Sequence, residues 1–333
     1  MKGILREGNL GNTLFGSGSV GVPLFFMVSG FIMYITTSGK EPSGKDIKNY
    51  FLKRLIRIVP LYLICTLLSI IIFDQTKYYF QSHPAKLLPV IFFFPTGGSN
   101  IGASYGMPPL AVGWSLNYEM YFYLLVGICM FFPRLRWSLL FLFLLASVFL
   151  IPLLTDGYIM RDLSGGYHYP VAYLKLMTNP VHLFFLFGVL SGMFYRSKFS
   201  IPLKLANILV IVSMINFALT YFKIYQISSV GYVSSIFNCG FLLMALLIRN
   251  KLKPIQCHPS FVFTGNISYS LYLVHPLLLT GIPTLIRTYS INLPSTGWIY
   301  FCLILILIFF CSYLSYLLIE KTLTKKIQGW LNF

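Results

Sequence analysis

The sequence predicts an all-α polytopic integral membrane protein that forms a single domain over residues 1–333. Three observations predict this class: hydrophobic residues make up 57% of the chain, charged residues make up only 10%, and apolar runs recur along its whole length. Soluble domains carry about 25% charged residues. A water-soluble fold has too little interior to bury this much apolar surface, so we expect a bundle of membrane-spanning helices.

A transmembrane helix needs about 20 mostly apolar residues. About nine segments meet this requirement, in order 19–38, 55–73, 112–132, 137–154, 178–196, 202–221, 227–248, 263–286 and 297–319. The apolar segment 87–95 is too short to cross a bilayer. We expect it to lie in the interface or to re-enter the membrane.

The loops between these segments predict the orientation. Of the 25 lysines and arginines, 17 fall in one set of alternate loops and 8 in the other. Cytoplasmic loops carry the excess of basic residues, so the C-terminus is expected in the cytoplasm and nine spans place the N-terminus outside. The same distribution accounts for the net charge of +17, and we expect no nucleic-acid partner.

The chemistry of metal and serine-nucleophile sites finds no support in the sequence. The six cysteines form no CxxC pair and five lie in apolar segments, which predicts small buried side chains. No HExxH or GxSxG motif is present, so neither a metal nor a serine triad is expected.

A glycine-rich stretch, GSGSVGVPLFFMVSGF, occupies residues 16–31 and places Ser29 in the middle of the first span. Glycines at a helix start allow the backbone to approach a ligand closely. The alternative is helix packing through small residues, which membrane proteins use widely.

Two arginines follow in KRLIRIVP, where Arg54 and Arg57 lie on one face of a starting helix. Paired guanidinium groups suit phosphate ligands. The alternative is a basic anchor that binds lipid head groups on the cytoplasmic side.

The stretch GWSLNYEMYFY, residues 113–123, places Ser115, Glu119 and Tyr123 on one helix face. A carboxylate at membrane depth costs roughly 2.5–3.5 kcal/mol, so Glu119 is a candidate functional residue. Trp114 and Tyr118 are expected in an interfacial aromatic belt. The alternative for Glu119 is a structural ion pair or a carboxyl group kept neutral by burial.

The stretch SYSLYLVHP, residues 268–276, places His275 near the centre of a span. Ser268, Tyr272 and His275 share one helix face, and Tyr269 is expected to point elsewhere. Imidazole is the usual general acid or base near neutral pH. The alternative is a histidine that only stabilises helix packing. At the end of the last span, Glu320 and Lys321 are expected to form an interfacial charge pair.

The strings GVPLFFMVSGF, RLIRIVP, GWSLNYEMYFY and ISYSLYLVHP, in this order and spacing, resemble the membrane-bound acyltransferase-3 family. The third string is similar to the branch that O-acylates bacterial exopolysaccharides. The match extends from about residue 16 through essentially the whole chain, and the combination of four ordered motifs makes it specific.

This resemblance implies a ten-helix core in a bacterial inner membrane. Such a core transfers an acyl group, often acetyl, from cytoplasmic acyl-CoA to a sugar hydroxyl of a surface polysaccharide or its lipid-linked precursor, without a bound cofactor. Residues that match family motifs by position are the paired arginines Arg54 and Arg57, associated with acyl-CoA binding, then Trp114, Ser115 and Glu119, then Tyr272 and His275. Glu119 and His275 are therefore the expected catalytic residues, and Ser29 and Tyr123 are expected to contact substrate.

Two departures from the family pattern affect this expectation. Pro23 stands where the family usually has an acidic residue. The family also begins with a helix that carries a histidine usually proposed as catalytic, and this sequence starts after that helix. The expectation is a member truncated or alternatively started at its N-terminus, with weak or absent activity for this chain alone.

Two other classes of protein remain open at this stage. A transporter or flippase of lipid-linked glycans would also have a basic cytoplasmic face and polar residues at membrane depth. A non-catalytic remnant of an acyltransferase would retain the same motifs. Labelled acyl-CoA separates these classes, because only a transferase passes the label to a glycan.

Overall fold

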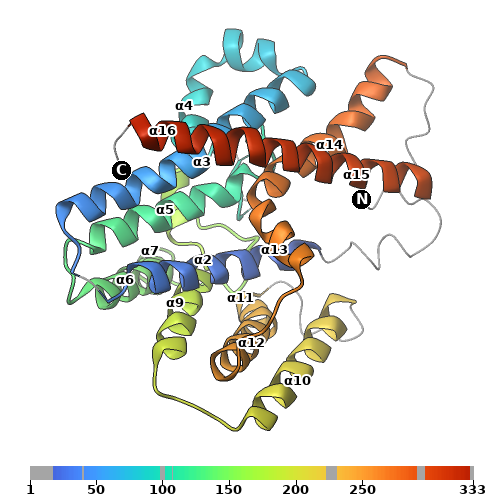
Figure 1. Ribbon diagram of the computed structural model, residues 1–333. Coiled ribbons are helices and arrows are strands. Elements are labelled where there is room, and N and C mark those ends of the chain that lie inside the picture. Colours follow the sequence, from blue (N-terminus) through green and yellow to red (C-terminus); the bar gives the residue numbers. More distant parts are fainter. Residues whose placement is uncertain are drawn as a thin grey trace.

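The computed structural model describes residues 18–39, 41–97, 102–106, 108–222, 231–290 and 297–330. In these residues the secondary-structure elements are all helices, joined by turns and loops (Figure 1). Within these ranges the only β-type pairing is an isolated bridge between Asp162 and Gly231. Gly16 and several basic residues used in the charge count, Lys2, Arg6, Lys40 and Lys223, lie outside the described residues.

The helices follow one another as short and long elements along the chain. The N-terminal half contains η1 Gly18–Val20, α2 Gly21–Thr37, α3 Gly44–Ile72, η2 Lys77–Ser82, η3 Pro84–Lys86, α4 Leu87–Ile91, α5 Gly113–Cys129, α6 Arg136–Leu145, η4 Ala146–Leu150 and α7 Ile151–Thr155. The C-terminal half contains α8 Ala172–Met177, α9 His182–Arg196, α10 Leu203–Tyr221, α11 Tyr232–Ser235, η5 Ile236–Gly240, α12 Phe241–Leu252, α13 Pro259–Asn266, α14 Ser268–Thr288, α15 Trp298–Ser315, η6 Tyr316–Leu323 and α16 Thr324–Trp330.

Seven helical segments in the described residues are long and apolar enough to cross a membrane, and the protein is a multi-pass membrane protein. They are Gly44–Ile72, Arg136–Thr155, Ala172–Arg196, Leu203–Tyr221, Tyr232–Leu252, Ser268–Thr288 and Trp298–Trp330. The other two predicted spans correspond to α2 and α5, which have 17 residues each. The sequence thus predicts nine spans, whereas seven helices in the described residues are long and apolar enough to cross a membrane. The segment predicted to be too short to span contains only the five-residue helix α4.

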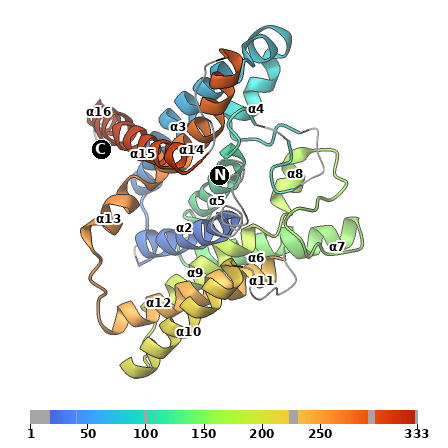
Figure 2. The ribbon, with the colours of Figure 1, turned by 90° about the vertical axis from the view of Figure 1, so that its right-hand side faces the viewer.

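The long helices form two groups on either side of α5. In Figure 2, α3, α14 and α15 lie on one side, and α2, α9, α10 and α12 lie on the other. Helix α5 packs against α3 from the first group and against α2 and α9 from the second. Thirteen of its 17 residues are buried, so protein rather than lipid surrounds the helix that carries Glu119.

The closest helix pair is α2 with α9, and two glycines make its short distance possible. A Cβ atom at Gly30 would lie 2.2 Å from the carbonyl oxygen of Phe185, and one at Gly188 would lie 1.9 Å from that of Met27. Membrane helices associate through such small residues because lipid offers no hydrophobic driving force between them. The glycine-rich stretch therefore serves helix packing at Gly30, the alternative considered for it.

Two arginines at helix ends, Arg196 of α9 and Arg136 of α6, bind the C-terminal end of α2. Arg196 donates to the carbonyl oxygens of Ser38 at 3.2 Å and Ile35 at 2.8 Å, and Arg136 donates to that of Thr37. These carbonyls belong to the last turn of α2, where a helix leaves its acceptors unsatisfied and where cations are favourable.

The prediction that the cysteines are buried is wrong for two of them, because the side chains of Cys257 and Cys302 are exposed.

Replacing Gly188 with alanine is expected to destabilise the protein, because the new methyl group would collide with the backbone of α2. We expect a cost of about 1–3 kcal/mol and a thermal unfolding midpoint in detergent that falls by several degrees. Gly44→Ala is the matched control, because a Cβ at Gly44 meets nothing within 4 Å. Equal midpoints for the two variants would contradict this account of the α2–α9 contact.

Candidate active site

A cavity of about 550 Å³ lies between α2, α3, α5 and α14. This volume is in the range of small-molecule sites. Eight of the nine side chains that the sequence predicts for the site line it: Ser29, Arg54, Arg57, Trp114, Glu119, Tyr123, Tyr272 and His275. The fold thus brings four motifs, spread over some 250 residues of sequence, to one cavity.

Glu119 is the carboxylate of this cavity, and it accepts hydrogen bonds from two hydroxyl groups. Its side chain is 6% exposed. Oε1 accepts hydrogen bonds from the Tyr123 hydroxyl, one turn along α5, and from Ser29 Oγ of α2 at 3.4 Å. Arg54 and Arg57 lie within electrostatic range. These neighbours offset the cost of placing an acidic group among apolar helices.

Arg54 is held rigidly beside this carboxylate. Its guanidinium lies 4.9 Å from the ring centroid of Tyr50 and 5.0 Å from that of Tyr123, so two aromatic faces contact it. The Tyr50 hydroxyl donates to the backbone oxygen of Tyr123 at 3.0 Å, which ties α3 to α5. Tyr50 is not among the residues that the motifs predict, although its position four residues before Arg54 on one helix places the two side chains side by side.

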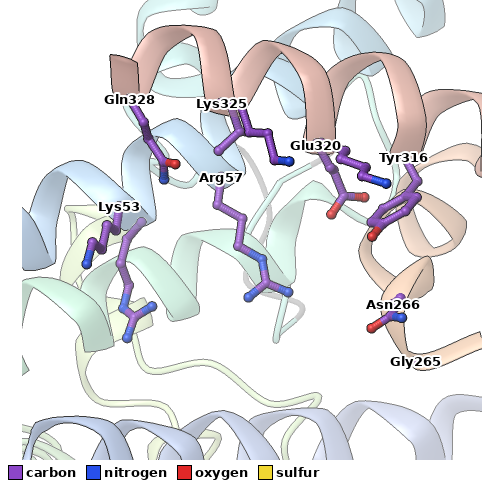
Figure 3. A pocket seen from close by; sticks show the side chains of 11 residues that line it. Lys53, Arg57, Gly265, Asn266, Tyr316, Glu320, Lys325 and Gln328 are labelled. Carbon is purple, nitrogen blue, oxygen red and sulfur yellow. The ribbon is translucent and has the colours of Figure 1, made fainter. Parts of the chain in front are cut away.

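Arg57 lies one turn further along α3 and makes no comparable stacking contact among the described residues. It lines the cavity and also a second, neighbouring pocket of about 500 Å³ (Figure 3). Both Glu119 and Glu320 lie within its electrostatic range. Arg57 therefore lies between the cavity and the second pocket and lines both.

Glu320 stabilises the helix that carries Tyr272 and His275. Its Oε1 accepts from the backbone N–H of Ser270 at 3.0 Å and from the Ser270 hydroxyl. Ser270 is the third residue of α14, so a carboxylate from η6 satisfies a donor that the helix itself cannot. The predicted interfacial pair with Lys321 is wrong, because α14 approaches η6 closely enough to take this carboxylate.

His275 is positioned with a free acceptor nitrogen. Its Nδ1 lies 3.1 Å from the backbone oxygen of Leu271. A carbonyl oxygen only accepts, so Nδ1 carries the proton of the neutral ring and Nε2 keeps a lone pair. Because the ring lines the cavity, the neutral form of this tautomer can accept a proton there.

Ser115 is the one predicted residue that does not line the cavity. It is fully buried, and its Oγ lies 2.6 Å from the Tyr272 hydroxyl and 3.0 Å from the Val112 backbone oxygen. Phe25 stacks on the other side of Tyr272, with ring centroids 6.0 Å apart. Ser115 thus positions Tyr272 across the contact between α5 and α14.

Two further expectations are corrected by the packing. Tyr269 lines the cavity although it was expected to point elsewhere, because α14 also faces α3, where the Tyr269 hydroxyl donates to the Ile58 backbone oxygen at 2.8 Å. Tyr118 does not lie in an interfacial belt. It is fully buried and donates to the Ala103 backbone oxygen at 2.8 Å.

The cavity therefore combines a buried carboxylate, an imidazole and two guanidinium groups. Such a set can move a proton and bind an anionic ligand. Among the described residues, no group of three histidine, cysteine or acidic side chains is placed to hold a metal ion.

Residues 4–317 match the family model described as an acyltransferase domain, acyltransferase-3. The chain belongs to this acyltransferase family, as its four motifs predict. It is 26% identical over 290 residues to "Exopolysaccharide production protein ExoZ" of Rhizobium meliloti (strain 1021), covering 85% of this chain and 83% of that protein. It is 25% identical over 272 residues to "Putative acetyltransferase ORF330" of Acidianus two-tailed virus, covering 80% and 74% respectively. No solved structure matches the chain.

Replacing Glu320 with alanine is expected to lower the thermal unfolding midpoint in detergent, because α14 loses a carboxylate at its first turn. Loss of such a cap costs about 1 kcal/mol, and Glu320→Gln should cost less because an amide oxygen still accepts. The control is Glu41→Ala. Glu41 forms a 3.9 Å ion pair with Arg134 in which both side chains are largely exposed, and such pairs contribute little. If Glu320→Ala and Glu41→Ala have the same thermal unfolding midpoint, Glu320 does not stabilise α14.

Proposed function

We propose that this protein transfers an acyl group, acetyl by preference, from cytoplasmic acyl-CoA to a sugar hydroxyl of a surface or exopolysaccharide or of its lipid-linked precursor. The observation that carries this proposal is the single cavity in which Glu119 and His275 meet two arginines, within a chain of the acyltransferase family. One relative is named for exopolysaccharide production and another as an acetyltransferase, which supports the acceptor and the acyl group.

The reaction exchanges a thioester for an ester. His275 Nε2 takes the proton of the acceptor hydroxyl as its oxygen attacks the thioester carbonyl. The carbon–sulfur bond then breaks, the ester carbon–oxygen bond is complete, and the proton passes to the leaving thiolate. Glu119, with its hydroxyl partners, balances the charge that develops on the imidazole during this transfer.

The remaining predicted residues bind and orient the two substrates. Arg54 and Arg57 attract the phosphate groups of the donor, for which guanidinium forks are suited. Trp114, Tyr123 and Tyr272 supply aromatic faces and hydroxyls, typical of groups that contact a sugar or an acyl chain. Ser29 takes part through its bond to Glu119, and the donor is a substrate rather than a bound cofactor.

We further propose nine membrane spans in one domain of a bacterial inner membrane, with the C-terminus in the cytoplasm. The two spans beyond the seven long helices are α2 and α5, which are short but lie among the other helices. Contacts between basic loops support the orientation. Arg136 and Arg196 both bind the end of α2, and Lys251 donates to the Phe199 backbone oxygen at 2.9 Å. The Lys- and Arg-rich loops thus share one end of the bundle, as cytoplasmic loops do.

Labelled acyl-CoA tests the proposed function directly. Membranes that contain the full chain are incubated with acetyl-CoA labelled in the acetyl group and with a polysaccharide or lipid-linked glycan acceptor. We expect label to enter the glycan faster than in membranes without the chain. Mild alkali should release this label as acetate, because it hydrolyses an ester bond.

Two other outcomes would contradict this proposal and indicate a different function. Glycan that crosses the membrane without acyl-CoA and without gaining label would indicate a transporter or flippase. A host polysaccharide whose acylation is unchanged by Glu119→Gln and by Arg57→Ala would indicate a non-catalytic remnant.

Substitution of the proposed catalytic pair should separate chemistry from binding. We expect His275→Ala and Glu119→Gln each to lower acyl transfer about 100-fold or more, the usual contribution of general acid–base catalysis, while the dissociation constant for CoA changes little. His83→Ala is the control, because His83 is an exposed histidine remote in sequence from the cavity motifs. Variants that lose CoA binding and transfer in parallel would assign these residues to substrate binding instead.

A further inference from the structure

A second pocket, of about 500 Å³, opens beside the cavity and gathers basic side chains from two helices that are distant in sequence. Figure 3 shows Lys53 and Arg57 reaching into it from α3, and Glu320 and Lys325 from the C-terminal helical segment. Arg54 and Lys321 also line it, and Gly265 and Asn266 of α13 close a third side. Five cationic side chains therefore surround a hollow space with a single carboxylate.

In the part of the chain that the structure describes, the three lysines of this pocket have no carboxylate partner, whereas Arg54 and Arg57 lie within electrostatic range of Glu119 and Arg57 also of Glu320. Among the described residues, none of the five forms a salt bridge with a carboxylate. Glu320 is not an unpaired carboxylate of the pocket. It accepts two hydrogen bonds from Ser270 and lies within electrostatic range of Arg57. Unpaired like charges that converge on one cavity repel one another, and a polyanionic ligand relieves this repulsion.

The pocket is joined to the catalytic cavity through shared residues. Arg54 and Arg57 line both spaces, so a single elongated molecule can occupy them together. Its polyanionic end would lie in the basic pocket, and its neutral arm would pass Arg57 toward Glu119 and His275. Tyr316 and Asn266 add a ring and an amide to the pocket wall, groups that can stack on and hydrogen-bond a nucleobase.

We propose that this pocket is the nucleotide subsite of the donor, in which Lys53, Lys321 and Lys325 bind the phosphorylated nucleotide end of acyl-CoA. The inference rests on the proposed function and extends it, because it assigns donor selection to lysines of α3 and of η6–α16. The lysines of the C-terminal segment thereby distinguish a CoA thioester from a thioester that lacks the nucleotide. A basic anchor for lipid head groups needs only an exposed cationic face, whereas these side chains line a pocket that shares Arg54 and Arg57 with the cavity.

The test compares binding of CoA and of pantetheine, which lacks the phosphates and the nucleoside, to the full chain in nanodiscs of neutral phosphatidylcholine. For the wild-type protein we expect tighter binding of CoA. The double variant Lys321→Gln/Lys325→Gln, and separately Lys53→Gln, should weaken CoA binding roughly tenfold, the loss expected for a charge-assisted contact. Pantetheine binding should not change, and Lys321→Arg/Lys325→Arg should restore CoA binding.

Two matched controls remove a lysine from the same helices without touching the pocket. Lys48 on α3 and Lys326 on α16 are exposed and do not line it, so Lys48→Gln and Lys326→Gln should bind CoA like the wild-type protein. Unfolding midpoints of all variants, measured without ligand, show whether a loss of binding reflects a loss of folding. If the double variant is unstable, the arginine variant and Lys53→Gln decide the result.

Each outcome supports or overturns the subsite. CoA binding that is equal in wild-type and lysine variants overturns it and leaves the proposed acyl transfer standing. If phosphatidylglycerol in the nanodisc stabilises the wild-type protein but not the lysine variants, and CoA binding is unaffected, the lysines bind lipid head groups. A wild-type protein that binds no CoA and transfers no label removes the proposed function together with the subsite.

Discussion

The energetic cost of a carboxylate among membrane helices is the constraint on which the rest of this structure depends. Glu119 lies in α5, a helix with 13 of its 17 residues buried, and is itself 6% exposed. The fold offsets this cost with a serine from α2, a tyrosine from α5 and two arginines from α3. Because the serine and the arginines come from other helices, satisfying Glu119 also brings α2, α3 and α5 together around one cavity.

The same constraint explains how α14 is held against this group of helices. Its first turn receives the carboxylate of Glu320, and its Tyr272 meets Ser115 of α5. Both contacts satisfy polar groups that lipid would leave unpaired. His275 is therefore carried on a helix that is fixed at two points, and a base in a fixed position is what proton transfer to or from a substrate requires.

Sequence periodicity predicted which helix faces carry some of the side chains that line the cavity, and its errors about other side chains have a common cause. The contact between Glu119 and Tyr123 follows from a spacing of four residues on one helix, which the sequence alone displays. Ser115 lies on the same stripe but turns toward α14, and Tyr269 lies off the expected stripe yet reaches α3. Which neighbour faces each sector of a helix is a property of the assembled bundle, so spacing alone could not assign these side chains.

The sequence by itself determined the class of protein, the approximate place of each helix and the family, because apolar length and ordered motifs are local properties of the chain. Only the tertiary structure decided that Glu320 supports α14 instead of pairing with Lys321, and that Lys53 and Lys325 face one pocket. The physical reason is that lipid-facing and protein-facing surfaces of membrane helices are both apolar. Periodicity therefore says little about helix rotation, and packing determines which polar side chains meet.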